Sequence, residues 1–130
     1  TSRNADLVRR LGATHVVDHT TTSVTDLDER YDVVFDTVGN LTIRTGRPLL
    51  RDGGRLLLAV ASLGDMARAR GDVRAGTSPE RAETFARLLS LVAAGDVEVV
   101  VESTFALDDI VAAHRVVDSG HKVGNVLVHP

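Results

Sequence analysis

The chain has 130 residues, of which 43% are hydrophobic, and these values suit one domain with a real core. Its 15 Lys and Arg against 18 Asp and Glu give a formal net charge of -3, and only 3% of its residues are aromatic. An acidic balance disfavours binding to nucleic acid or an anionic membrane, and few aromatic residues leave little surface for stacking on bases. We therefore expect no nucleic acid or membrane partner. The absence of cysteine excludes disulfides and thiolate metal sites, and with no visible signal peptide or membrane span the expectation is a cytoplasmic protein.

The first part of the chain alternates between helical and strand patterns. Residues 4–11 predict a short helix that ends at Gly12, and His15–Asp18 predict a short strand. Tyr31–Gly39 follow as a nearly continuous run of apolar, β-branched residues, which is typical of a strand buried on both faces of a parallel sheet. A weaker helical spacing covers 41–50, where a glycine and a proline reduce its strength.

Asp36 interrupts this apolar run near its carboxyl end. Open α/β sheets bind their ligands beyond the carboxyl ends of their strands, so Asp36 is a candidate ligand-contacting residue. A second interpretation is equally open, in which its carboxylate only stabilises the turn that follows.

The rest of the chain continues the alternation. Asp52-Gly53-Gly54 predicts a turn, Arg55–Val60 a second buried strand, and Asp65–Thr77 a mobile surface loop rather than a binding patch. Thr77 and Glu80 have the spacing of a capping box at the start of a helix. The remaining elements are expected as a helix, a strand, a helix and a strand, at 77–94, 97–101, 107–117 and 123–129. This order predicts an α/β protein.

Familiar catalytic motifs are missing from the sequence. The five histidines lack the spacing of a metal site, and His114 is expected to be a packed histidine rather than a catalytic one. No serine lies in a Gly-x-Ser-x-Gly turn, and Gly-x-Gly-x-x-Gly does not occur. The residues by themselves therefore provide half of a ligand crevice and no catalytic group.

Six segments nevertheless stand in a familiar order, at 2–13, 16–19, 31–39, 49–56, 112–115 and 120–128. Together they resemble the zinc-binding dehydrogenase family, and within it the quinone oxidoreductase branch of the medium-chain dehydrogenases, which usually works without catalytic zinc. The family has a Rossmann cofactor domain and a separate catalytic domain, and this chain resembles the later part of the cofactor half. Asn125 departs from the pattern, because the family commonly has lysine there.

The resemblance implies an incomplete Rossmann-type parallel sheet with flanking helices, in which the first β-α-β unit and the glycine-rich turn are absent. Residues 1–130 would form a partial nucleotide-binding domain without the upstream catalytic domain, and would be inactive alone. In the usual strand order, His15–Asp18 and the Tyr31 strand would be separated by two strands, which leaves an exposed apolar edge. We expect either that the first segment pairs with this edge or that a second copy covers it in a homo-oligomer.

The resemblance also implies positions for a dinucleotide. Ser2 and Arg3 fall in the loop that reads the adenosine ribose, where a hydroxyl and an arginine suit the 2′-phosphate of NADP. NAD is less favoured, because no acidic residue lies within 1–4. An alternative remains, in which Ser2 only caps a helix and Arg3 is solvated. His19 falls near the same phosphate.

On the nicotinamide side, the resemblance implies four small residues, Val38, Gly39, Ala61 and Ser62. It assigns no catalytic residue and no metal ligand within the chain. The function implied is hydride transfer from NADPH to a quinone, enone or related carbonyl substrate, with the chemistry supplied by the cofactor. Two alternatives are a zinc-dependent alcohol dehydrogenase with its ligands outside this chain, and a non-catalytic Rossmann-like binding module.

Overall fold

The computed structural model describes residues 4–77 and 80–130, so Ser2 and Arg3 lie outside the described residues. The chain divides into two compact units. Unit 1 consists mainly of His15–Pro79, and unit 2 consists of Ser2–Thr14 and Glu80–Pro130. Within the described ranges, no helix has both the length and the apolar character needed to cross a bilayer.

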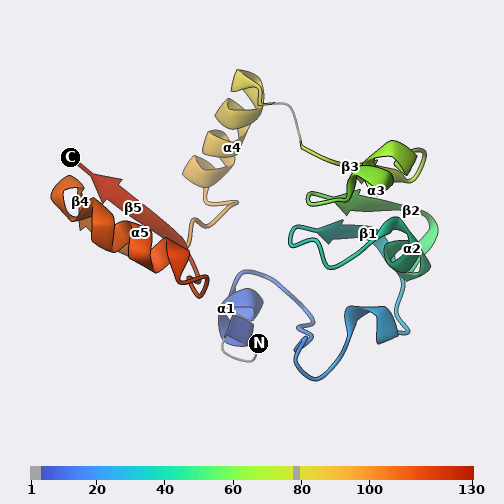
Figure 1. Cartoon of the computed structure of the whole chain (residues 1–130). Helices are drawn as coiled ribbons and strands as arrows, with labels where there is room; N and C mark the ends of the chain where they lie inside the picture. Colours follow the sequence, from blue (N-terminus) through green and yellow to red (C-terminus); the bar gives the residue numbers. More distant parts are fainter. Residues whose placement is uncertain (1–3, 78–79) are drawn as a thin grey trace. The chain divides into compact units, whose positions relative to one another are not determined.

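Unit 1 is built on a three-stranded parallel sheet (Figure 1). Its strands lie in the order β1 (Tyr31–Asp36), β2 (Leu50–Leu58) and β3 (Val73–Ala75). Parallel neighbours cannot be joined by a tight hairpin, so each pair needs a crossover connection. The connections carry the short helices α2 (Ile43–Gly46), η3 (Arg47–Leu49) and α3 (Leu63–Arg68).

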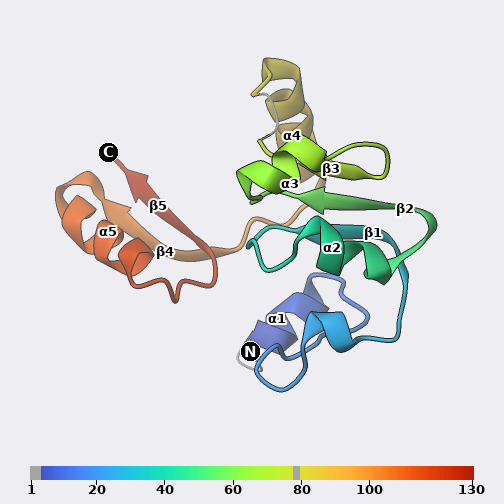
Figure 2. The same cartoon turned by 45° about the vertical axis from the view of Figure 1, so that its right-hand side comes forward.

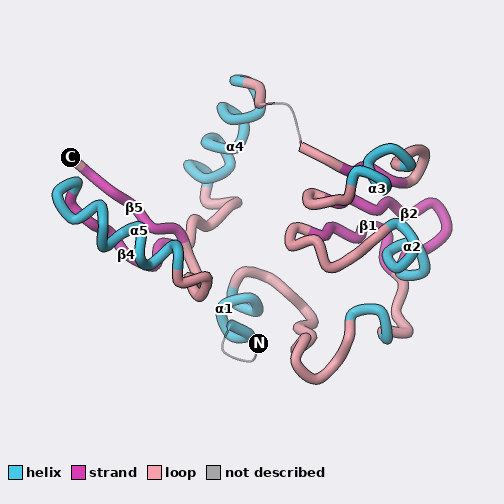
Figure 3. The backbone as a smooth tube through the Cα atoms, viewed as in Figure 1, coloured by secondary structure: helices cyan, strands magenta, loops and turns pink. Residues whose placement is uncertain are grey.

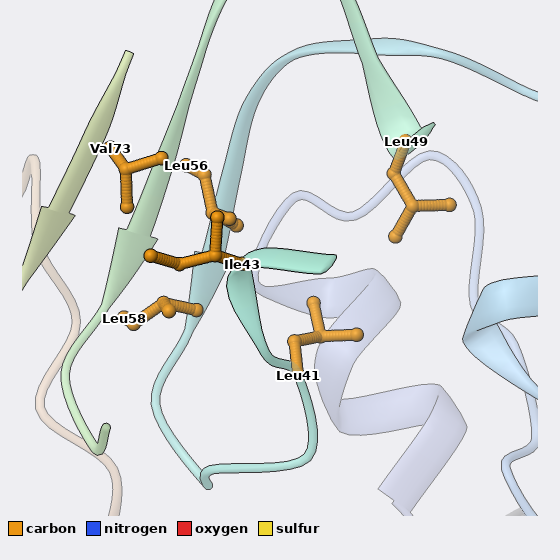
Figure 4. Packing of buried hydrophobic residues seen from close by; sticks show 6 residues of the cluster. All are labelled: Leu41, Ile43, Leu49, Leu56, Leu58 and Val73. Atoms are coloured by element: carbon orange, nitrogen blue, oxygen red, sulfur yellow. The ribbon is translucent and has the colours of Figure 1, made fainter. Parts of the chain in front are cut away.

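One face of this sheet forms the core of unit 1. Side chains alternate between the faces of a strand, and Leu56, Leu58 and Val73 are the largest fully buried side chains. They pack with three further buried residues from the β1–β2 connection, Leu41, Ile43 and Leu49 (Figure 4). Helix α2 comes very close to β2. A Cβ on Gly46 would lie only 2.7 Å from Leu56 Cδ1. Glycine at this position is therefore what allows the contact.

The opposite face of the sheet is open, which contradicts the expectation of a strand buried on both faces. Val33 and Phe35 point to that face and are 55% and 63% exposed. The apolar run at 31–39 places hydrophobic side chains on both faces of the strand. Each face becomes buried only when another element covers it. Helix α2 covers only the face that carries Leu56 and Leu58.

Unit 2 is built on one β-α-β arrangement. Strands β4 (Val101–Ala106) and β5 (Asn125–His129) are parallel. The connection between them contains η4 (Leu107–Asp109) and then α5 (Ile110–Asp118). Helix α5 lies along the strand pair in both views (Figures 1 and 2). The unit also contains α1 (Ala5–Arg10) and α4 (Ala82–Ala94). Arg10 on α1 contacts Glu98 through Nη1 at 2.6 and 2.7 Å from its two oxygens. Both side chains are half exposed, so this pair stabilises the unit by about 1 kcal/mol at most.

The expected α/β class with parallel sheets is confirmed, as are the helix near the N-terminus, the strands β1 and β2, and the closing α5 and β5. The expected strand at His15–Asp18 is wrong, since this segment is drawn as loop (Figure 3). The Asp18 carbonyl instead accepts hydrogen bonds from Thr21 and Thr22 and closes a turn. The first segment therefore does not pair with β1, which forms one edge of the sheet.

Three further boundaries differ from expectation. The expected turn at Asp52–Gly54 lies inside β2, where Gly53 takes a φ of +79° and the register with β1 shifts. The expected loop at 65–77 contains most of α3 and all of β3. The expected strand at 97–101 begins only at Val101.

Helix α4 also starts later than its capping pattern predicts, with Arg81 at the N-cap and no side-chain cap. No residue of α4 is buried. His114 on α5 is likewise exposed rather than packed.

Candidate functional site

The candidate site lies where β1 and β2 end side by side. Asp36 and Leu58 are partners in the parallel register, and the Ala59 N–H donates to the Asp36 carbonyl at 2.9 Å. The two loops that follow, 37–41 and 59–62, consequently leave the sheet at the same edge. This edge is the one at which open parallel sheets bind their ligands.

The Asp36 carboxylate holds the first of these loops. Its Oδ1 accepts hydrogen bonds from the backbone N–H groups of Val38 (3.0 Å) and Gly39 (2.9 Å), and its Oδ2 accepts one from Leu41 (2.7 Å). Asp36 is only 7% exposed. Of the two interpretations left open by the sequence, the structure supports the carboxylate that stabilises the turn.

This environment lowers the pKa of Asp36. Burial by itself raises the pKa, since it disfavours the charged carboxylate. The backbone N–H donors of Leu41, Val38, Gly39 and Asn40 together outweigh burial, so the net pKa lies below the ordinary value. Asp36 therefore stays ionised at neutral pH and serves as an anchor for the loop.

Gly39 brings the two loops into contact. A Cβ at this position would lie 3.0 Å from Val60 Cγ1 and 3.2 Å from Val60 Cβ, which is tighter than normal packing allows. Its φ of +90° also lies in the region that favours glycine. The sequence-based prediction includes Gly39 but not Val60. The signal that could have indicated Val60 is the small size of Gly39, because a glycine just beyond one parallel strand leaves room for a residue just beyond the next.

Ala61 and Ser62 continue this edge from the β2 side. Ala61 packs against the core cluster. The Ser62 Oγ accepts from the Asp65 N–H at 3.1 Å and donates to Asp65 Oδ2 at 3.1 Å, so it caps α3. Val38 from the β1 side is 71% exposed. The structure thus brings Val38, Gly39, Ala61 and Ser62 to one edge of unit 1.

The remaining predicted cofactor residues are His19, Ser2 and Arg3. His19 is exposed and belongs to the turn that begins at Asp18. Ser2 and Arg3 fall outside the described residues. The structure therefore brings together the nicotinamide-side set, and of the set assigned to the adenosine phosphate it describes only His19.

The edge offers shape and backbone groups rather than acid–base chemistry. Loop 37–41 contains no ionisable side chain, and Asp36 is engaged below it. Among residues 4–77 and 80–130, no group of three His, Asp or Glu side chains is placed to hold a metal ion. Two cavities of unit 1, of about 570 and 580 Å³, are lined by other residues. We place the candidate site at the edge nonetheless, because open α/β sheets bind their ligands in the crevice beyond the carboxyl ends of their strands.

Comparison with known proteins decides the family. The family model for zinc-binding dehydrogenases matches residues 11–128. The chain belongs to the zinc-binding dehydrogenase family. It is 26% identical over 132 aligned residues to the NADPH-dependent alkenal/one oxidoreductase, chloroplastic, of Arabidopsis thaliana, covering 96% of this chain. It is 26% identical over 127 residues to 2-methylene-furan-3-one reductase of Solanum lycopersicum, again covering 96% of this chain.

Solved structures agree with this membership at the level of fold. The quinone oxidoreductase from Coxiella burnetii matches with a TM-score of 0.72 at 20% identity, covering 97% of this chain and 42% of that chain. A thermostable alcohol dehydrogenase from Pyrobaculum aerophilum matches with a TM-score of 0.68 at 22% identity, covering 100% and 41%. The parallel sheets with flanking helices are thus of the Rossmann type found in these dehydrogenases.

The chain spans 31% of the length of each of these two curated relatives. The family name refers to zinc, and the residues present do not fit that metal. The chain has no cysteine, and the described His, Asp and Glu side chains form no cluster that could bind it.

Gly39→Ala should destabilise unit 1 through both its backbone and its contact. A non-glycine residue at positive φ costs about 1–2 kcal/mol, and the contact with Val60 should add roughly 1–3 kcal/mol. Urea unfolding of the chain measures the loss. The matched control is Gly71→Ala, because Gly71 has a φ of +65° and nothing within 4 Å of a built Cβ. Equal losses in the two variants would show that the Val60 contact is unimportant.

Proposed function

We propose that this chain supplies part of the nucleotide-binding domain of an NADPH-dependent oxidoreductase that reduces quinones, enones or related activated carbonyl compounds. The observation that carries the proposal is the edge at which Gly39 and Val60 meet beyond the ends of β1 and β2. Membership in the zinc-binding dehydrogenase family and the NADPH-dependent alkenal/one oxidoreductase named for the Arabidopsis relative support the choice of reaction and cofactor.

The chain's own residues would bind and orient the cofactor rather than move protons. The small residues Val38, Gly39, Ala61 and Ser62 would let a flat ring approach the backbone of the two loops. Asp36 would hold loop 37–41 in place through its three hydrogen bonds. The position of this loop would in turn set the position of the ring. A bound nicotinamide cofactor supplies the hydride, and the protein supplies position and shape.

The direct test uses protein expressed from the whole reading frame that encodes this chain. Consumption of NADPH, followed by absorbance, should occur with an enone or a quinone and should not change when a zinc chelator is added. Oxidation of a simple alcohol that the chelator abolishes would instead establish a zinc-dependent alcohol dehydrogenase. Absence of cofactor binding altogether would refute the proposed function.

Cofactor choice provides a second prediction in the same protein. If Arg3 contacts the 2′-phosphate, Arg3→Glu should weaken NADPH binding far more than NADH binding. Loss of one charge-assisted hydrogen bond is worth roughly 1.5–3 kcal/mol, and the new charge adds repulsion. Michaelis constants for the two cofactors measure the effect, with Arg9→Glu on α1 as a charge-matched control. Equal changes for NADPH and NADH would remove the assignment of Arg3.

A further inference from the structure

A groove on unit 1 lies outside the candidate cofactor edge. It is formed between α2 with η3 and α3, and has a volume of about 580 Å³, within the usual range of roughly 300–1,000 Å³ for small-molecule sites. Its lining residues are Ile43, Arg44, Arg47, Pro48, Asp65 and Arg68. All six belong to unit 1, so the groove is complete within that unit.

The charges around this groove do not cancel one another. Arg47 is engaged with Asp72, with Nε and Nη2 at 3.1 and 2.9 Å from the two carboxylate oxygens. Within 4–77 and 80–130, the guanidinium groups of Arg44 and Arg68 form no ion pair or hydrogen bond. Asp65, the acidic member of the lining, is hydrogen bonded to Ser62. The groove therefore has two cationic groups available and one carboxylate already partly satisfied.

The position of Arg68 follows from a glycine. Its Nη1 lies 3.1 Å from the point where a Cβ on Gly64 would stand, so the guanidinium folds back over the first turn of α3. The groove also has apolar lining residues, the buried Ile43 and the exposed Pro48. Cationic and apolar side chains that line one groove suit a ligand with both an anionic head and an apolar part.

We propose that this groove binds a small amphipathic carboxylate, with its head between Arg44 and Arg68 and its aliphatic part against Ile43 and Pro48. A charged hydrogen bond from arginine is about twice as strong as a neutral one, and arginine is suited to the planar carboxylate. The apolar part adds affinity in proportion to the area removed from water. The site is independent of the hydride chemistry proposed above.

The test is an NMR titration of the 130-residue chain with octanoate, which carries both chemical features. We expect shifts concentrated in α2 and α3, and roughly tenfold or more weaker binding in the double variant Arg44→Gln/Arg68→Gln. The matched control is Arg55→Gln, because Arg55 lines the neighbouring cavity and not this groove. Arg44 and Arg68 are exposed, so the fold should be unchanged, and backbone amide shifts verify this.

Two companion probes separate the parts of the proposal. Acetate keeps the carboxylate and loses the tail, and octan-1-ol keeps the tail and loses the charge, so each should bind more weakly than octanoate. Equal octanoate affinity in the double variant and the parent chain would overturn the site. Acetate binding as tightly as octanoate would overturn the amphipathic ligand, and shifts confined to residues outside α2, η3 and α3 would overturn the location.

Discussion

Leu56→Ala should destabilise unit 1 by about 3–5 kcal/mol, the upper part of the range for a fully buried leucine. Leu56 has no exposed surface and sits at the centre of the sheet, where it pairs with Val34 on β1 and Val73 on β3. Truncation loses the transfer free energy of the side chain and leaves a cavity. Urea denaturation, with fluorescence of a reporter or circular dichroism, measures the free energy of unfolding.

The matched control for this change is Leu57→Ala. Leu57 occupies the next position of the same strand, but its side chain points to the open face and is only half-buried. Its truncation should cost about 1 kcal/mol, since little apolar area is exposed to water by the change. Similar losses for the two leucines would mean that the sheet is not covered on the face that carries Leu56.

Gly46 allows a double-mutant cycle on the same contact. Gly46→Ala alone should destabilise the protein, because its Cβ would lie 2.7 and 2.8 Å from the two δ carbons of Leu56. In the Leu56→Ala background these carbons are gone, and the new methyl group should fill part of the cavity. We therefore expect a stabilising coupling of roughly 1–3 kcal/mol between the two changes. Simple additivity would contradict the observed approach of α2 to β2.

Asp36→Ala should be the most damaging change at the candidate site, with a loss of about 3–5 kcal/mol. Three backbone N–H groups, those of Val38, Gly39 and Leu41, lose their acceptor at once. Asp36→Asn should cost less, because its amide oxygen can still accept from part of this set. Hydrogen exchange at these three amides distinguishes a loosened loop from global unfolding. The exposed Asp32, on the same strand, provides the control Asp32→Ala, which should change little.

The same carboxylate should make stability depend on pH in acid. The pKa of Asp36 is lower in the folded chain than its ordinary value of about 3.9, so the unfolded chain binds the proton more readily. The stabilisation is fully present above the ordinary pKa and is lost as pH falls through the lower folded value. The difference in unfolding free energy between the wild type and Asp36→Asn should consequently shrink below about pH 4. A difference that stays constant across that window would contradict the assigned role.

Much of the local structure is predictable from the residues. The apolar run at 31–36 gave β1, the run at 55–58 gave the second half of β2, and Gly95 and Gly120 lie just after α4 and α5, where helix-ending glycines belong. The predicted nicotinamide-side residues do lie along one edge, since parallel strands place their carboxyl ends together. Segment order along the chain also indicated the zinc-binding dehydrogenase family, which the family match confirms.

Other features required neighbours that a local pattern does not identify. His15–Asp18 has strand-like residues, but the segment belongs to neither of the described sheets, and a strand is stable only as part of a sheet. The polar segment at 65–77 was expected to be loop, yet β3 forms there because Val73 can pair with the fully buried Leu56. The exposure of Val33 and Phe35 likewise depends on which face α2 covers.

The sequence by itself determined the class of the fold, because periodicity, glycine positions and β-branched runs act over a few residues at a time. Tertiary structure alone decided the role of Asp36, whose carboxylate could equally have faced a ligand until three N–H groups were seen to converge on it. It also decided that Gly39 meets Val60 and that two arginines border an apolar groove. The residues of these last two features are distant in sequence: the parallel pairing of β1 with β2 brings Gly39 to Val60, and α2, η3 and α3 together line the groove.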